Sequence, residues 1–130
     1  MPAARLKDRL AEVARDQAFR NSLGEGAYVL DEHGHLLELN PAGEDLLGWD
    51  AEELRGRDMH EAVHYQRPDG TPYPRDECPL LGVLRSGVDF AETHDMFIRK
   101  DGSQLPVAYV SSPVLVDDEV VGAVLAFWSR

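Results

Sequence analysis

The second half of the chain alternates between apolar runs and short polar turns, a pattern typical of antiparallel strands. Three apolar runs cover residues 90–99, 105–115 and 120–128. Asp101-Gly102 separates the first two runs, and Asp117-Asp118-Glu119 separates the last two. Asp-Gly is a strong hairpin signal because glycine accepts the positive φ of a tight turn. The sequence therefore predicts three consecutive strands in an antiparallel meander.

The first half of the domain is predicted to begin with another hairpin. Residues 27–30 and 35–39 are short apolar runs on either side of the turn-forming stretch Asp31-Glu32-His33-Gly34. Asn40 is a favoured N-cap and Pro41 suits the first helical position, so a short helix should begin there. A hairpin followed by a helix is therefore expected over residues 27–47.

Three further short helices are predicted before the final strands. Asp50 and Glu53 have the spacing of a capping box. In this motif each of the two side chains accepts a hydrogen bond from the backbone N–H of the other residue. Residues 59–63 are expected to form one helical turn. Pro79 fits the first turn of a helix that Ser86-Gly87 should end.

Residues 2–22 are predicted to form a helix that precedes the strands. Leu6, Leu10 and Val13 lie three and four positions apart, which gives one narrow apolar stripe. Such a stripe is closer to a coiled-coil seam than to the face of a core helix. Two interpretations remain open: the helix lies on its own domain, or it pairs with a second copy. In the second case these three residues form a homodimer interface.

Composition narrows the classes of partner. The chain has 130 residues, enough for one domain, and a formal net charge of −11. Such a surface disfavours direct contact with nucleic acid or anionic lipid. The single cysteine, Cys78, rules out an internal disulfide and fits a cytoplasmic protein. No signal peptide is recognisable, and the longest apolar run, Val120–Trp128, is too short to span a membrane.

Four blocks of residues resemble the PAS family of sensory domains, in order and at the family's intervals. The resemblance covers roughly Gly24 to Phe127. The blocks are Asn40-Pro41-Ala42 with Leu47-Gly48-Trp49; Glu53-Leu54 with Gly56; Phe97-Ile98-Arg99-Lys100-Asp101-Gly102; and Pro113-Val114 with Val121-Gly122-Ala123-Val124 and Phe127.

The resemblance implies an α+β fold. We expect a five-stranded antiparallel sheet with short helices over one face and an N-terminal amphipathic helix. The flanking helix would span residues 1–22 and the PAS domain residues 23–130. The resemblance also implies a bacterial sensory and dimerisation module that catalyses nothing itself. It would couple a ligand, or a change at an interface, to an attached effector such as a histidine kinase.

Four residues are candidates for lining or covering the cavity that the resemblance implies: His60, His64, Tyr65 and Cys78. His60 and His64 are four apart, so they share a face if that turn is helical. Cys78 could approach them as a third metal ligand. No CxxC pair, His-Glu-x-x-His motif or carboxylate set accompanies them, so we predict no metal site and favour hydrogen-bonded histidines.

The sequence is compatible with several kinds of signal. Related haem-binding domains use a histidine on the helix before the third strand, and residues 79–84 contain none, so His60 or His64 would have to serve. Flavin photochemistry is not expected because the family's reactive-cysteine block is absent. A small metabolite, or no ligand, remains open. We expect Cys78 to be a buried apolar residue rather than a redox-active thiol or a hydrolase nucleophile.

Overall fold

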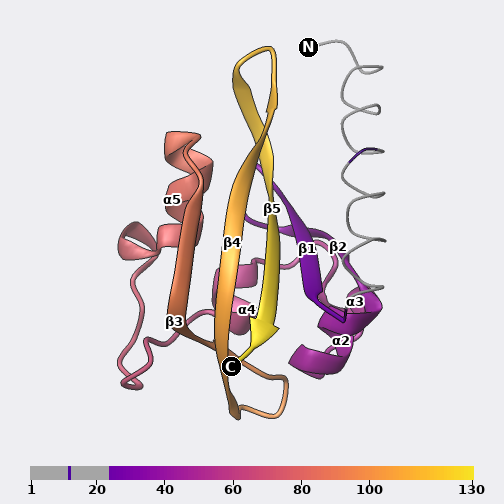
Figure 1. The fold of residues 1–130 in the computed structure, drawn as a ribbon, viewed down its shortest axis with the longest axis vertical. Coiled ribbons are helices and arrows are strands. Elements are labelled where there is room, and N and C mark those ends of the chain that lie inside the picture. Colours follow the sequence, from indigo (N-terminus) through magenta and orange to yellow (C-terminus); the bar gives the residue numbers. More distant parts are fainter. Residues whose placement is uncertain (1–11, 13–23) are drawn as a thin grey trace.

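A twisted five-stranded antiparallel sheet is the frame of the domain (Figure 1). The computed structural model describes residue 12 and residues 24–130. The strands lie in the order β2-β1-β5-β4-β3, so the predicted hairpin and the predicted meander are both present. Their bounds are β1 Gly26–Asp31, β2 Leu36–Leu39, β3 Phe90–Ile98, β4 Gln104–Val116 and β5 Glu119–Ser129.

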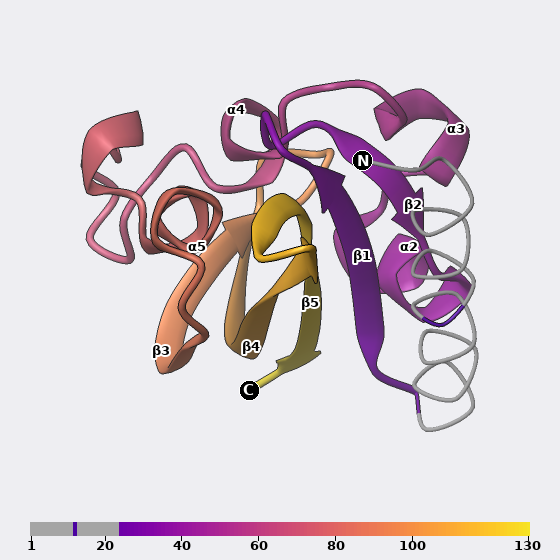
Figure 2. The same cartoon turned by 90° about the horizontal axis from the view of Figure 1, so that it is seen from above.

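The helices pack against one face of the sheet (Figure 2). Their buried side chains join those of all five strands in a single apolar cluster. The 3₁₀ helix η1 was not predicted, because the proline-rich stretch before it has no periodicity. The bounds are α2 Pro41–Leu47, α3 Ala51–Leu54, α4 Met59–Val63, η1 Arg75–Glu77 and α5 Pro79–Ser86. The predicted α+β fold is confirmed.

Asn40 joins the first strand to the first described short helix. Its side-chain oxygen accepts hydrogen bonds from the backbone N–H of Gly43, at 2.8 Å, and of Ala27, at 2.9 Å. Its amide nitrogen donates to the carbonyl of Glu25 at 2.8 Å. The residue is only 6% exposed. The predicted N-cap therefore also fixes where β1 starts, because one side chain serves both elements.

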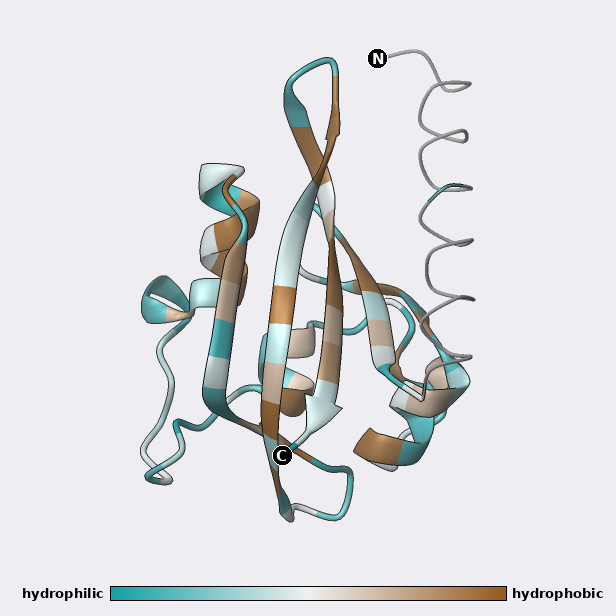
Figure 3. Ribbon diagram, viewed as in Figure 1, coloured by the Kyte–Doolittle hydropathy of each residue, from teal (hydrophilic) through white to brown (hydrophobic). Residues whose placement is uncertain are grey.

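The turn between β3 and β4 is built as the Asp-Gly signal predicts, with Gly102 at φ 86°. It also contacts the helices. The backbone N–H of Lys100 donates to the carbonyl of Leu47 at 3.0 Å, and its ammonium lies 2.6 Å from a carboxylate oxygen of Glu53. The end of this hairpin is hydrophilic and lies against α2 and α3 (Figure 3). The turn thus holds the sheet to the helical layer.

The two faces of the sheet differ in what covers them. On the inner face Phe97 stacks on Tyr109, with ring centroids 5.6 Å apart, and meets Phe127 edge-on at 5.4 Å. On the outer face of β4 and β5, Val110 and Trp128 remain about two-fifths exposed, at 42% and 39%. The core therefore sits between the sheet and the short helices.

The predicted N-terminal stripe of Leu6, Leu10 and Val13 lies outside the described residues. Among the residues that are described, no helix is both long and apolar enough to cross a membrane.

The β4–β5 turn offers a test of local strain. Asp117 and Asp118 have φ of 52° and 66°, the positive values that a two-residue type I′ turn requires. Glycine adopts such values freely, whereas alanine does not. Asp118→Gly should therefore unfold with a free energy about 1 kcal/mol above that of Asp118→Ala. Both variants remove the same charge, so urea denaturation compares them directly. Equal stabilities would contradict this turn geometry.

Candidate functional site

A buried pair between α4 and β3 lies at the centre of the candidate site. Asp58 caps α4 by accepting hydrogen bonds from the backbone N–H of His60, at 2.9 Å, and of Glu61, at 3.3 Å. The short helix then ends at His64, whose side chain is almost fully buried. Its Nε2 lies 3.0 Å from Oδ2 of Asp95 on β3. This contact fixes the end of α4 to the sheet.

Asp95 is held by donors from two strands. The hydroxyl of Tyr109 on β4 donates to the same Oδ2 at 2.6 Å, and the backbone N–H of Met96 donates to Oδ1 at 2.7 Å. Asp95 is 7% exposed and Tyr109 is 1% exposed. The carboxylate therefore has partners on both oxygens, which a buried charge needs.

Cys78 completes a line of three side chains. It occupies the N-cap position of α5, directly after η1, and is 1% exposed. Its Sγ lies 3.4 Å from Nδ1 of His64, on the side of the ring away from Asp95. Cys78, His64 and Asp95 thus have the order of a thiol, an imidazole and a carboxylate, although every member is buried.

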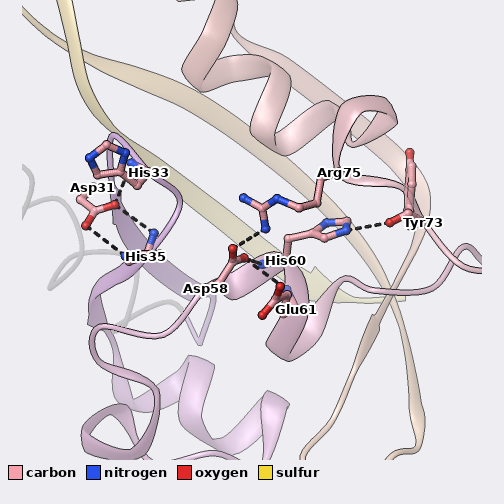
Figure 4. Close-up of polar contacts among 8 residues, drawn as sticks. All are labelled: Asp31, His33, His35, Asp58, His60, Glu61, Tyr73 and Arg75. Atoms are coloured by element: carbon pink, nitrogen blue, oxygen red, sulfur yellow. Dashed lines mark hydrogen bonds and ion pairs between the residues drawn. The ribbon is translucent and has the colours of Figure 1, made fainter.

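His60 lies one helical turn before His64, with the two rings edge-on at 5.9 Å. Its Nε2 donates to the carbonyl oxygen of Tyr73 at 2.7 Å (Figure 4). Nδ1 of the same ring is buried and has no hydrogen-bond partner among the residues that the structure describes. An ion pair between Arg75 and Asp58 holds the segment after Tyr73 against the start of α4.

The pKa shifts of His64 and Asp95 indicate that these two residues form a charged pair inside the domain. Burial alone would lower the pKa of His64, but hydrogen bonds to Asp95 and Cys78 raise it to about 9. Burial alone would raise the pKa of the Asp95 carboxyl, but His64 and Tyr109 hold it below its usual value. Burial lowers the pKa of His60. At neutral pH the site therefore contains an imidazolium–carboxylate pair beside a neutral histidine.

The cavity beside this cluster is very small. The space open to the centre of a water molecule is about 10 Å³, enough for a single water. A haem or a flavin does not fit there. A separate surface pocket of about 250 Å³ is lined in part by Asp95, Tyr73 and Tyr109. The cavity is lined by Tyr28, Leu30, Gly34, Met59, His60, His64, Cys78, Leu80 and Leu81.

Three of the four candidate residues come together. One ligand atom each from His60, His64 and Cys78 lies within 4.8 Å of the other two. The side chain of Tyr65 is 38% exposed and does not line the cavity, although its carbonyl accepts from the backbone N–H of Tyr73. Asp95 was not anticipated. Its position two residues before Phe97, on the same face of β3, was the available signal.

The buried pair predicts a strongly non-additive pattern of stability. Asp95→Ala leaves the buried His64 ring and the Tyr109 hydroxyl without the carboxylate that they share, and should cost about 3–5 kcal/mol of unfolding free energy. The double variant Asp95→Ala, His64→Leu removes both charges, so it should cost much less than the two single costs added together. Urea denaturation at pH 7 measures the single variants Asp95→Ala and His64→Leu and the double variant. Additive costs would show that the two groups do not form an ion pair.

A profile of the PAS domain family matches residues 24–128. No curated protein sequence matches the chain. Several solved structures share its fold at low sequence identity.

The PAS domain of nitrogen regulation protein NR(II) from Vibrio parahaemolyticus is 18% identical, with a TM-score of 0.66 over 88% of this chain and 97% of that one. The PAS domain of an HTR-like protein from Haloarcula marismortui is 20% identical, with a TM-score of 0.67 over 98% and 99%. A LOV domain from a blue-light activated histidine kinase of Erythrobacter litoralis is 17% identical, with a TM-score of 0.65 over 81% and 94%. With the profile match over most of its length, the chain belongs to the PAS domain family.

Proposed function

We propose that this chain is the sensory and dimerisation module of a bacterial signal-transduction protein located in the cytoplasm. It would pass a change in the buried cluster of His60, His64, Cys78 and Asp95 to an attached effector, such as a histidine kinase. The observation that carries the proposal is the His64–Asp95 contact, which joins the helical layer to the sheet through one charged pair. Membership of the PAS family and the low, acidic pI of about 4.7 agree with it.

A change in the cluster would reach the sheet through the hydrogen bond between Tyr109 and Asp95. Tyr109 binds Asp95 from the inner face of β4, and the next residue, Val110, faces outward and is 42% exposed. A change in the charge or position of Asp95 therefore acts on the strand that carries the exposed apolar face. Such a device needs two arrangements that differ by a few kcal/mol, which a signal and an effector both bias.

Dimerisation is assigned to the N-terminal helix. The stripe of Leu6, Leu10 and Val13 supports this assignment, since its spacing is that of a two-stranded seam. A helix that leads from a dimer seam to β1 would couple the state of the sheet to the pairing of two copies. Changes in that pairing are a general means of controlling an attached effector.

Any catalytic activity would belong to the attached effector and not to this chain. Cys78, His64 and Asp95 have the order of a cysteine hydrolase site, but Cys78 is only 1% exposed. The adjoining cavity accepts one water at most, so a substrate has no room beside the thiol.

A sensor for a small metabolite is the second candidate. The surface pocket of about 250 Å³ that reaches Asp95 and Tyr109 favours it, because a polar ligand there would touch the cluster directly. Mass spectrometry of compounds released on denaturing the purified protein distinguishes this candidate from a ligand-free module.

The dimer interface can be tested with two matched substitutions. Leu10→Glu places a charge in the stripe and should weaken dimerisation roughly tenfold or more. Ala11→Glu adds the same charge at the neighbouring position outside the stripe and should leave the dimer intact. Sedimentation velocity over a concentration series gives both dissociation constants. Equal effects, or a wild-type protein that stays monomeric, would reject this interface.

Coupling between the cluster and the dimer gives a second prediction. Asp95→Asn keeps the size of the side chain but removes its charge, and should shift the dimer dissociation constant by about 5–150-fold. Leu47→Ala in α2 is the control, because Leu47 is buried but lines neither the cavity beside His64 nor the surface pocket beside Asp95. If both variants leave the dissociation constant unchanged, or shift it equally, the cluster does not control dimerisation.

A further inference from the structure

We propose that His60, His64 and Cys78 form a binding site for one transition-metal ion of the zinc class. No metal site was predicted from the sequence, because two histidines and a distant cysteine match no ligand motif. In the folded chain, the α4 segment and the start of α5 bring ligand atoms of these three residues within 4.8 Å of one another. All three residues are buried, so these are not surface groups that meet by chance.

Both histidines already have the outer hydrogen bonds that metal ligands use. Nε2 of His64 contacts the carboxylate of Asp95 at 3.0 Å, and Nε2 of His60 donates to the carbonyl of Tyr73 at 2.7 Å. In metal sites the second ring nitrogen of a ligating histidine is held by a carboxylate or a backbone carbonyl in this way. These bonds leave Nδ1 of each ring as the metal ligand.

The unpartnered Nδ1 of His60 is the second, independent observation. His60 is 6% exposed, and this nitrogen has no hydrogen-bond partner among the described residues. Because Nε2 donates its proton to Tyr73, Nδ1 of the neutral ring carries an unshared electron pair. A buried acceptor without a donor is costly. A metal ion would satisfy it.

The distances need only a small adjustment. Tetrahedral zinc with bonds of about 2.0–2.3 Å places its ligand atoms roughly 3.3–3.8 Å apart. Sγ of Cys78 is already 3.4 Å from Nδ1 of His64. The ion would take the place of the proton on Nδ1 of His64 and the proton on the thiol, and both are released to solvent. The ligand atom of His60 lies within 4.8 Å of the other two, so an approach of up to about 1 Å completes the tetrahedral spacing.

The donor set selects the class of metal. Two imidazoles and a thiolate suit zinc, cobalt and other borderline ions, and they do not suit calcium or magnesium, which prefer oxygen ligands. The adjoining cavity of about 10 Å³ has room for one water, which is the fourth ligand that a three-residue zinc site requires. The site is therefore expected to hold a single Zn²⁺ ion with one exchangeable position.

The ring of Tyr73 packs against His64 and also borders a surface pocket. Its centroid is 4.9 Å from that of His64, and its side chain lines the surface pocket that reaches Asp95.

The test uses the whole 130-residue chain, stripped of metal with a chelator and kept reduced. Zn²⁺ is titrated against a chromophoric chelator to obtain stoichiometry and affinity, and Co²⁺ is added separately for absorption spectroscopy. We expect one ion per chain and a cobalt spectrum with thiolate charge-transfer and tetrahedral d–d bands. Binding that is weaker than micromolar, or a cobalt spectrum without the thiolate band, would overturn the proposal.

Variants assign the ligands. Cys78→Ala should abolish the thiolate band, and His60→Gln should lower zinc affinity while its amide keeps the bond to Tyr73. Asp95→Asn should weaken zinc binding by about 10–100-fold, because this carboxylate orients His64 without touching the ion. Circular dichroism confirms that each variant is folded.

The matched control is His33→Gln with His35→Gln. These rings lie 6.3 Å apart near the surface, and the side chain of His33 is 72% exposed. This double variant should bind Zn²⁺ as the wild-type protein does. If it loses binding while Cys78→Ala and His60→Gln retain it, the ion binds at the surface and the proposal is wrong.

Discussion

The candidate site depends on the buried contact between His64 and Asp95. Removing two charges from water costs several kcal/mol for each, so such a pair persists only when the remaining hydrogen-bonding groups are satisfied. Asp95 meets that condition through Tyr109 and the backbone of Met96. The helix α4, which His64 directly follows, has five residues, too few to be stable alone. The cap at Asp58 and the contact with Asp95 hold it in place.

The remaining features follow from that anchor. Fixing the end of α4 sets the position of His60 one turn earlier and brings the ring of His64 against Cys78. Tyr109 donates to Asp95 through its hydroxyl and stacks on Phe97 through its ring, so the charged pair and the aromatic core share a side chain. A change in the cluster cannot be confined to the helices, because the same ring is part of the sheet. This arrangement suits a sensory domain, and it also suits a metal ion that ties the same elements together.

Local signals in the sequence predicted most of the fold. The Asp-Gly turn, the Asn40 cap and the Asp50–Glu53 spacing each act within a few residues, and the structure contains all three elements. The site was harder to predict. A register shift between Glu92 and Asp95 interrupts the alternation of β3, so the inward direction of Asp95 does not follow from the start of the strand. The proline-rich stretch after His64 likewise has no periodicity, so the hydrogen bond between His60 and the carbonyl of Tyr73 could not be predicted from it.

The most direct measurement is the proton on Nε2 of His64. In metal-free protein at pH 7, two-dimensional nitrogen–proton NMR of the histidine rings should show a slowly exchanging N–H at this position, shifted downfield by the Asp95 carboxylate. Asp95→Ala, if folded, should lose that shift and exchange faster. A ring of His64 whose two nitrogens both exchange rapidly with solvent would contradict a buried pair, and with it the account of how this site is held.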